Sequence, residues 1–255
     1  MTIPTEQFAL FLMLLLRGTS MFVAAPMFGN LSIPGPVKIG LGVFLAFVLF
    51  PIVSVGAPLT DRSLGELFLI ALREVLTGLS IGLAMQVLFS GIRFAGDMIS
   101  FDMGFSMSTI FDAENGTQFP VISELLYWFL LMIFLSVNGH HFMLEAVYMS
   151  YGAVPIGTFS IGDAAMESVI SLTATMFVIA VKIAAPLLVS LFLANISLGI
   201  LNKVMPQMNI FAVMFPLKIG IGFIVLSATV PVIAFVFKKS LTAFEASVVE
   251  LIKVM

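Results

Sequence analysis

The chain lacks cysteine altogether, which excludes disulfides, thiolate metal sites and cysteine nucleophiles. Charged side chains are also scarce, at 10% of the 255 residues, against about 25% in an average soluble domain. A soluble fold could not hide so much apolar surface, because its own exterior needs a polar coat. Bilayer lipid or other protein chains must therefore cover the remainder.

The chain also has no excess of basic residues over acidic ones. The formal net charge is −3, which argues against nucleic acid as a partner. What the chain has instead is apolar sequence, with 60% hydrophobic residues and a mean hydropathy of +1.18. This composition predicts a membrane-associated protein.

Long apolar runs carry the secondary-structure prediction. They show no alternation of polar and apolar residues, as barrel strands would, so the predicted class is all-α. Prolines interrupt them and predict kinked, short helices and broken hairpins. Five runs have about the length of a bilayer span: Ile39–Thr60, Val75–Ile92, Leu125–Leu144, Ile183–Asn202 and Ile219–Phe237.

Charges at four positions separate apolar stretches: Arg17, Glu145, Lys182 and Lys218. A charge at the middle of a membrane costs about 2.5 to 3.5 kcal/mol on insertion scales. Two explanations stay open. Either the side chains extend toward helix ends, or the helices pair in a large assembly where partners or water satisfy the charges.

Catalytic patterns are weak. Gly78, Ser80 and Gly82 match G-x-S-x-G, but within an uncharged helical run the glycines favour close packing of helices. An intramembrane serine protease with Ser80 and His140 is the enzymatic alternative. His140, His141 and Glu145 offer too few ligands for a catalytic zinc ion. We predict no enzyme activity, no metal and no cofactor.

The segment from Arg93 to Glu124 does not resemble a span. It carries one arginine and five acids, which sum to −4. Gly, Asn and Pro predict a loop in its latter part. This loop is unusually apolar for an exposed one, so another surface must cover its side chains: Met103, Phe105, Met107, Ile110, Phe111 and Phe119.

Several stretches, taken in order and spacing, resemble FliR, the family of flagellar biosynthetic proteins of the type III export gate. The resemblance runs from about residue 8 to residue 237, although Asp97 and Asp102 stand where Glu and Gln are expected in many relatives. The stretches that carry it are Ala25–Gly29, Ile33 with Pro34, Val37–Leu41, Arg73–Gly82, Ala95 with Gly96, Met103–Phe105, Asn138–His140, Ser150, Val154–Gly157, Leu198–Ile200, Met205–Phe211 and Pro216–Ile219.

The resemblance implies a single domain over residues 1–255, built of kinked helical hairpins. A FliP-like part would be followed by a FliQ-like part in a spiral shell. The implied partners are FliP-like, FliQ-like and FlhB-like subunits, with unfolded flagellar proteins as transient cargo. The implied location is the bacterial inner membrane, at the export apparatus of the flagellar basal body.

The resemblance also implies roles for particular residues. The loop Met103–Phe119 would close the channel as a plug, with Phe105, Met107, Ile110 and Phe111 as sealing side chains. The alternative is permanent packing of this loop on a neighbouring subunit. Residues of subunit contact or structural motifs are Asn138, His140, Pro206, Gln207, Asn209 and Phe211.

Other functions stay open at this point. The same resemblance fits the homologous subunit of a virulence injectisome. An independent transporter is a further alternative, although the chain shows no corresponding broken segments in two halves, which transporters of that kind normally have.

Overall fold

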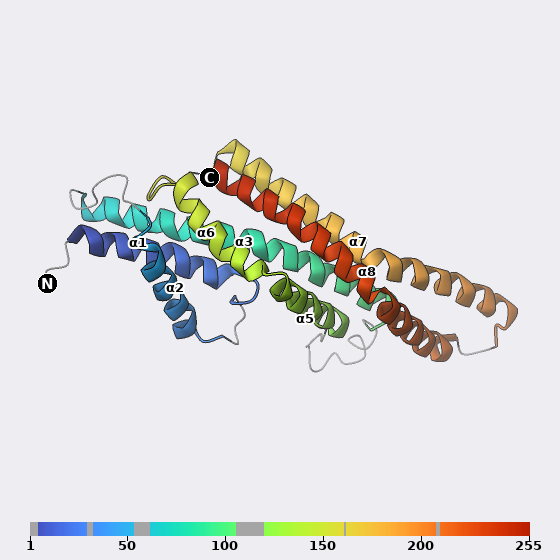
Figure 1. Ribbon diagram of the computed structural model, residues 1–255. Helices are drawn as coiled ribbons and strands as arrows, with labels where there is room; N and C mark the ends of the chain where they lie inside the picture. The colour runs from blue at the N-terminus through green and yellow to red at the C-terminus, as the bar shows by residue number, and fades with distance from the viewer. Residues whose placement is uncertain (1–4, 30–32, 54–61, 106–119, 161, 208–209) are drawn as a thin grey trace. The chain divides into compact units, whose positions relative to one another are not determined.

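The computed structural model describes residues 5–29, 33–53, 62–105, 120–160, 162–207 and 210–255 (Figure 1). Within these ranges every regular element is an α-helix, which confirms the predicted all-α class. The helices are α1 (Thr5–Ala24), α2 (Gly35–Leu49), α3 (Leu64–Met103), α5 (Val121–Ser136), α6 (Gly139–Ala153), α7 (Asp163–Val204) and α8 (Ile210–Val254).

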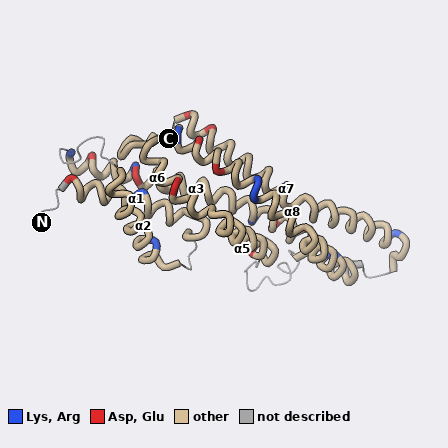
Figure 2. The backbone as a smooth tube through the Cα atoms, viewed as in Figure 1, with Lys and Arg blue, Asp and Glu red and all other residues tan. Residues whose placement is uncertain are grey.

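Four of these helices are long and apolar enough to cross a membrane: α1, α3, α7 and α8. Helices α5 and α6 together pass the same test as one broken span, which gives up to five. Charged residues are rare along the helices (Figure 2). The chain therefore has the character of a membrane protein.

The prediction of short helices is wrong for three elements. Helix α3 has 40 residues, α7 has 42 and α8 has 45. Pro186 lies inside α7, and Pro216 and Pro231 lie inside α8, without ending either helix. A proline removes one backbone donor. In long apolar helices, neighbouring groups can satisfy the freed carbonyl, so the helix continues.

Two predicted spans also need correction. In the described part of the run Ile39–Thr60, which ends at residue 53, the helix is α2, which has 15 residues and ends at Leu49. The run Leu125–Leu144 is divided between α5 and α6. Between them Asn138 has a left-handed backbone conformation, with φ of 62°. Asn tolerates this conformation better than most residues, and the regular helical path ends there.

The described chain forms two compact units. Unit 1 comprises Met1–Phe89, Asn138–Ala174 and Thr242–Met255, and unit 2 comprises Ser90–Val137 and Thr175–Leu241. Helices α3, α7 and α8 contribute residues to both. The single domain over residues 1–255 stays a prediction.

Close backbone approaches define the core of unit 1. Helix α1 packs along α2, and Gly42 of α2 lies so near Thr19 that a Cβ there would collide with it. Gly78 and Gly82 of α3 approach α1 in the same way, the first at Arg17 and Ser20, the second at Met21 and Ala24. Small residues permit helix axes to come this close.

In unit 2, glycines also allow helices to approach one another closely. Gly91 of α3 lies against Met176 of α7, and Gly96 of α3 lies against Ser123 of α5. The Ser123 hydroxyl donates a hydrogen bond to Asp97 Oδ1. The core of each unit is thus built from helix pairs whose separation is set by glycine.

Candidate functional site

A fully buried ion pair lies within unit 1. Arg17 of α1 donates from Nε to Glu74 Oε2 over 2.8 Å and from Nη2 to Glu74 Oε1 over 3.0 Å. Both side chains are 0% exposed. This bidentate geometry matches the planar guanidinium to the carboxylate and is among the strong hydrogen-bonded pairs.

The remaining donors of Arg17 are also satisfied. Nη1 donates to the Ser150 hydroxyl and to the Val154 carbonyl, and Nη2 donates to the same carbonyl, each over 3.1 Å. With the two bonds to Glu74, all five N–H groups of the guanidinium have acceptors. Its carbon Cζ lies 4.1 Å from the centre of the Tyr151 ring, close enough for a cation–π interaction.

Glu74 connects the pair to the segment that follows α6. Its Oε1 accepts a hydrogen bond of 2.9 Å from the backbone N–H of Gly157. The neighbouring Arg73 donates from Nη1 to the Gly157 carbonyl over 2.6 Å. Gly157 has φ of +79° and lies against Ile70, a backbone conformation that favours glycine. Glycine here lets both of its backbone groups meet α3.

Local sequence explains how these groups meet. Glu74 and Gly78 are one turn apart on α3 and therefore lie on the same side of the helix. The close approach at Gly78 brings the backbone of Arg17 against α3. The short distance between the helices places the Arg17 side chain within reach of Glu74.

This geometry resolves the question raised by Arg17. The Arg17 side chain does not extend to a helix end, and its charge needs no partner chain, because Glu74 neutralises it within unit 1. Glu145 and Lys182 are exposed, and Lys218 is half-buried. The cluster is a structural centre that joins α1, α3, α6 and the segment after α6.

A second ion pair, in unit 2, is more open. Arg93 Nη2 lies 3.3 Å from Glu124 Oε1, with side-chain exposures of 43% and 35%. Arg93 Cζ lies 4.3 Å from the centre of the Tyr127 ring. A pair with this exposure is screened by its surroundings and contributes much less than a buried one.

The beginning of the predicted plug loop is the described part of that segment. Met103 is the last residue of α3 and is fully buried, where its side chain packs on Gly222 of α8. Gly104 has φ of +92° and lies against Phe215. The rings of Phe105 and Phe223 meet edge to face with their centres 6.5 Å apart. Helix α8 therefore holds the start of this loop.

The structure brings together few of the other predicted residues. Asn138 precedes α6 and is exposed, and His140 is half-buried, with no hydrogen-bond partner for Nδ1 among the described residues. Pro206 and Gln207 are exposed after the end of α7, and Phe211 lies in the first turn of α8. Outside the described residues lie Met107, Ile110, Phe111, Phe119 and Asn209.

The catalytic alternatives gain no geometric support in the described parts of the chain. The Ser80 hydroxyl donates to the Leu76 carbonyl over 2.9 Å, within its own helix. Across the described ranges, no group of three or more His, Asp and Glu side chains is arranged to hold a metal ion.

Comparison with known proteins gives the family. The family of bacterial export proteins, family 1, matches residues 8–244. The chain belongs to this family. It is 34% identical to the flagellar biosynthetic protein FliR of Bacillus subtilis (strain 168) over 237 residues, which cover 92% of this chain and 91% of that protein. The predicted relationship to FliR is therefore confirmed.

Other family members give similar values. FliR of Escherichia coli (strain K12) is 30% identical over 222 residues, or 86% of this chain and 84% of that protein. FliR of Aquifex aeolicus (strain VF5) is 30% identical over 232 residues, or 91% of this chain and 89% of that protein. This chain is thus a flagellar export-family protein with membrane character.

The pairing of Arg17 with Glu74 is the feature that sequence reasoning missed. A signal for it was present, because both residues are ionisable groups within otherwise apolar stretches. Such groups in membrane segments commonly pair with one another. Their separation of 57 positions in the sequence gave no indication of which partner each would take.

Proposed function

We propose that the chain is a subunit of the flagellar type III protein export gate. In this role it completes the channel together with FliP-like and FliQ-like subunits, and it helps to seal that channel. An FlhB-like subunit associates with the assembly, and unfolded flagellar proteins pass through it. The gate lies in the bacterial inner membrane, at the flagellar basal body.

Membership of the export family over residues 8–244 is the observation that carries this proposal. The composition supports it, because so apolar a chain needs lipid or other subunits around it. Many large side chains lie exposed on its surface, among them Phe44, Phe47 and Phe235. These surfaces suit a chain that is completed by neighbours.

Sealing is assigned to the loop Met103–Phe119. The start of this loop is held against α8, because Met103 packs on Gly222 and the ring of Phe105 contacts the ring of Phe223. Its end precedes α5, which begins after Pro120. A loop fixed at its base can return to one closed position after each passage of cargo. Apolar constrictions are an established physical means of gating.

The partners can be tested by purification in mild detergent. The full chain is co-expressed with its genomic neighbours, captured through a tag, and the bound chains are identified by mass spectrometry. We expect a stable complex with FliP-like and FliQ-like chains. A lone, monodisperse chain, despite confirmed expression of those neighbours, would overturn the proposal and favour an independent transporter.

The seal needs a separate experiment. Shortening the segment from Ser106 to Thr117 should leave the complex assembled but make the membrane leak small solutes. Unchanged permeability in an intact complex would refute the plug role and favour a loop packed on its neighbour. The virulence injectisome subunit is the remaining alternative, and neighbouring genes of the flagellar or virulence type separate the two.

A further inference from the structure

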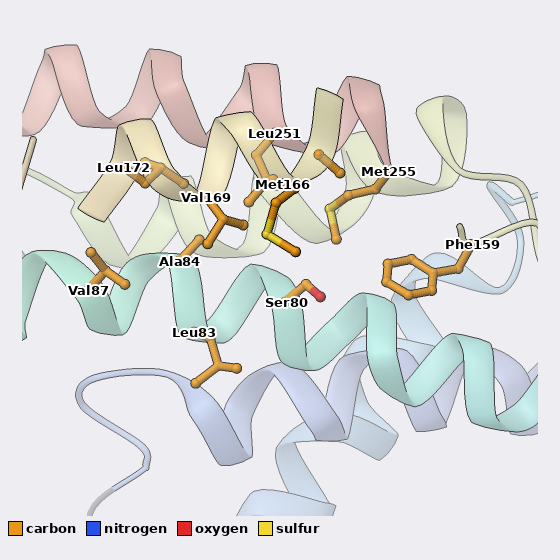
Figure 3. A pocket seen from close by; sticks show the side chains of 11 residues that line it. Ser80, Leu83, Ala84, Val87, Phe159, Met166, Val169, Leu172, Leu251 and Met255 are labelled. Carbon is orange, nitrogen blue, oxygen red and sulfur yellow. The ribbon is translucent and has the colours of Figure 1, made fainter. Parts of the chain in front are cut away.

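An open apolar groove lies within unit 1, between α3 on one side and the start of α7 with the end of α8 on the other (Figure 3). Its volume is about 240 Å³. An engineered apolar cavity of about 150 Å³ in another protein is large enough to bind benzene. This groove therefore has room for a substantial part of a hydrocarbon chain.

The wall of the groove offers almost no polar group. Its single hydroxyl, on Ser80, donates to the Leu76 carbonyl of its own helix. The other walls are hydrocarbon, thioether or aromatic side chains, among them Ala84, Val87, Val169, Leu172, Leu251 and Phe159. A polar ligand would lose its hydration here without gaining hydrogen bonds, so the occupant must be apolar.

The groove opens to the outside of the chain. Leu83 and Met166 both line it, and they are 55% and 54% exposed. Beside the lining residue Val169 on α7, the apolar side chain of Ile170 is exposed as well, at 62%. The mouth is therefore continuous with an apolar surface of the kind that faces lipid tails in a membrane protein.

One end of the groove carries a positive charge. Along α3 the lining residues run from Val87 to Ser80 toward Phe159 (Figure 3). Arg73 lies two helical turns beyond Ser80 in this direction, toward the N-terminus of α3. Because seven residues separate the two positions, Arg73 and Ser80 lie on the same face of the helix. Its guanidinium donates to the Gly157 carbonyl, two residues before Phe159.

The charge on Arg73 is not neutralised within the cluster. Glu74 forms its ion pair with Arg17, so the three charged side chains of this cluster, two arginines and one glutamate, sum to +1. In the described part of the chain no carboxylate forms an ion pair with the exposed Arg73. One of its donors is used by Gly157, and a phosphate oxygen is well suited to the others.

We propose that this groove binds an acidic phospholipid of the surrounding bilayer, with one acyl chain between α3, α7 and α8 and the phosphate on Arg73. The apolar walls select a hydrocarbon chain, and the uncompensated guanidinium at the Phe159 end selects an anionic headgroup. The lipid would join α3 to the ends of α7 and α8. This proposal does not depend on the gate function.

The test uses the delipidated full chain in detergent and native mass spectrometry with added phosphatidylglycerol. Two variants address the two halves of the site: Arg73→Gln removes the charge, and Val169→Trp fills the groove from a partly exposed position. Matched controls are Arg62→Gln, an exposed arginine before α3, and Ile170→Trp, the exposed neighbour that does not line the groove.

We expect one bound phosphatidylglycerol, with an affinity about tenfold weaker in each test variant, since one charge-assisted contact or the displaced chain contributes that much. The controls should bind as the unchanged chain does. Phosphatidylcholine should bind about tenfold more weakly, because its headgroup has no net charge. Free glycerol phosphate should not compete, because it has no acyl chain.

Three results would overturn the proposal. The first is equal binding by test and control variants. The second is competition by glycerol phosphate, which would indicate a simple anion site. The third comes from a photo-crosslinking residue at Val169 in the assembled complex: an adduct with a partner chain in place of lipid would assign the groove to a protein contact. Unchanged helix content and elution volume establish that each variant is folded.

Discussion

Arg17 and Glu74 form a two-pronged hydrogen-bonded ion pair between α1 and α3, in which neither side chain has any exposed surface. Arg17 is also the largest of the fully buried side chains in the described structure. A buried pair of this kind adds little over well-packed apolar residues, yet it is very sensitive to the loss of one partner. The first prediction follows from that asymmetry.

Replacing Glu74 with Gln should lower the free energy of unfolding by about 3–5 kcal/mol, because it leaves the Arg17 charge buried without a counter-ion. Glutamine can still accept one hydrogen bond, but it cannot neutralise the guanidinium. Thermal or denaturant unfolding of the purified chain in detergent measures the change.

The second ion pair supplies the control. Glu124→Gln should cost about 1 kcal/mol or less, since Arg93 and Glu124 are both partly exposed. A double variant, Arg17→Met with Glu74→Leu, should recover much of the loss caused by Glu74→Gln. Equal effects of the two glutamate variants would contradict the importance of burial.

Gly78→Ala should destabilise the contact between α1 and α3. An added Cβ would collide with the Ser20 hydroxyl and with the backbone carbonyl of Arg17, and a backbone atom cannot move aside cheaply. We expect a loss of about 1–3 kcal/mol, the usual cost of overpacking a core. The same unfolding measurement applies.

The control for this variant lies on the same helix. A Cβ at Gly65 would meet nothing within 4 Å, and alanine is the better helix former by about 1 kcal/mol. Gly65→Ala should therefore leave stability unchanged or raise it. A loss there as large as at Gly78 would contradict the explanation that the close approach of α1 decides the outcome.

Gly104→Ala tests the base of the proposed plug. Its positive φ suits glycine, and Phe215 occupies the space of a side chain. We expect a cost of about 1–2 kcal/mol from the left-handed backbone, together with increased solute leakage, because the loop start can no longer rest on α8. Permeability of cells that carry the assembled complex measures the second effect.

Gly162→Ala serves as its comparison, since that glycine is exposed and has open space around it. It should leave both stability and permeability unchanged. If Gly104→Ala destabilises the chain without any leak in the assembled complex, then the loop base does not control closure.

Asn138 offers a test of conformation against contact. With φ of 62°, Asn138→Gly should retain stability and export, because glycine adopts this conformation freely. Asn138→Val should cost about 1–2 kcal/mol, because a β-branched residue is strained there. Loss of export in the glycine variant, with stability intact, would instead support the predicted subunit contact of the asparagine side chain.

Composition and periodicity were sufficient for the helical class and the membrane character. They were insufficient for helix lengths, because an internal proline such as Pro186 ends a helix only when nothing else satisfies the freed carbonyl. They also placed Met103 in the loop, whereas it closes α3 and is buried. Its burial depends on Gly222, more than a hundred positions away.

The candidate site was predictable only in fragments. Arg17 was recognisable as an anomaly, and Arg73, Glu74, Val154 and Gly157 lay within stretches that resemble the family. Nothing local indicates that these stretches converge on one guanidinium, because the contacts span up to 137 residues. The apolar groove along α3 was equally unpredictable, since most of its wall residues are ordinary apolar members of three helices.

The residues that contact Arg17 lie far from it in the sequence, and this has a consequence for the synthesis of the chain. A ribosome adds about 5–20 residues per second, so roughly 3–11 seconds separate Arg17 from Glu74, which lies 57 residues later. Until then α1 carries a solitary charge and is poorly suited to lipid. Once α3 has been made, Glu74 can neutralise this charge, so we expect α1 to be inserted together with α3. Ser150 and Val154 are made later still, so their hydrogen bonds to Arg17 can form only after both charged residues have been synthesised.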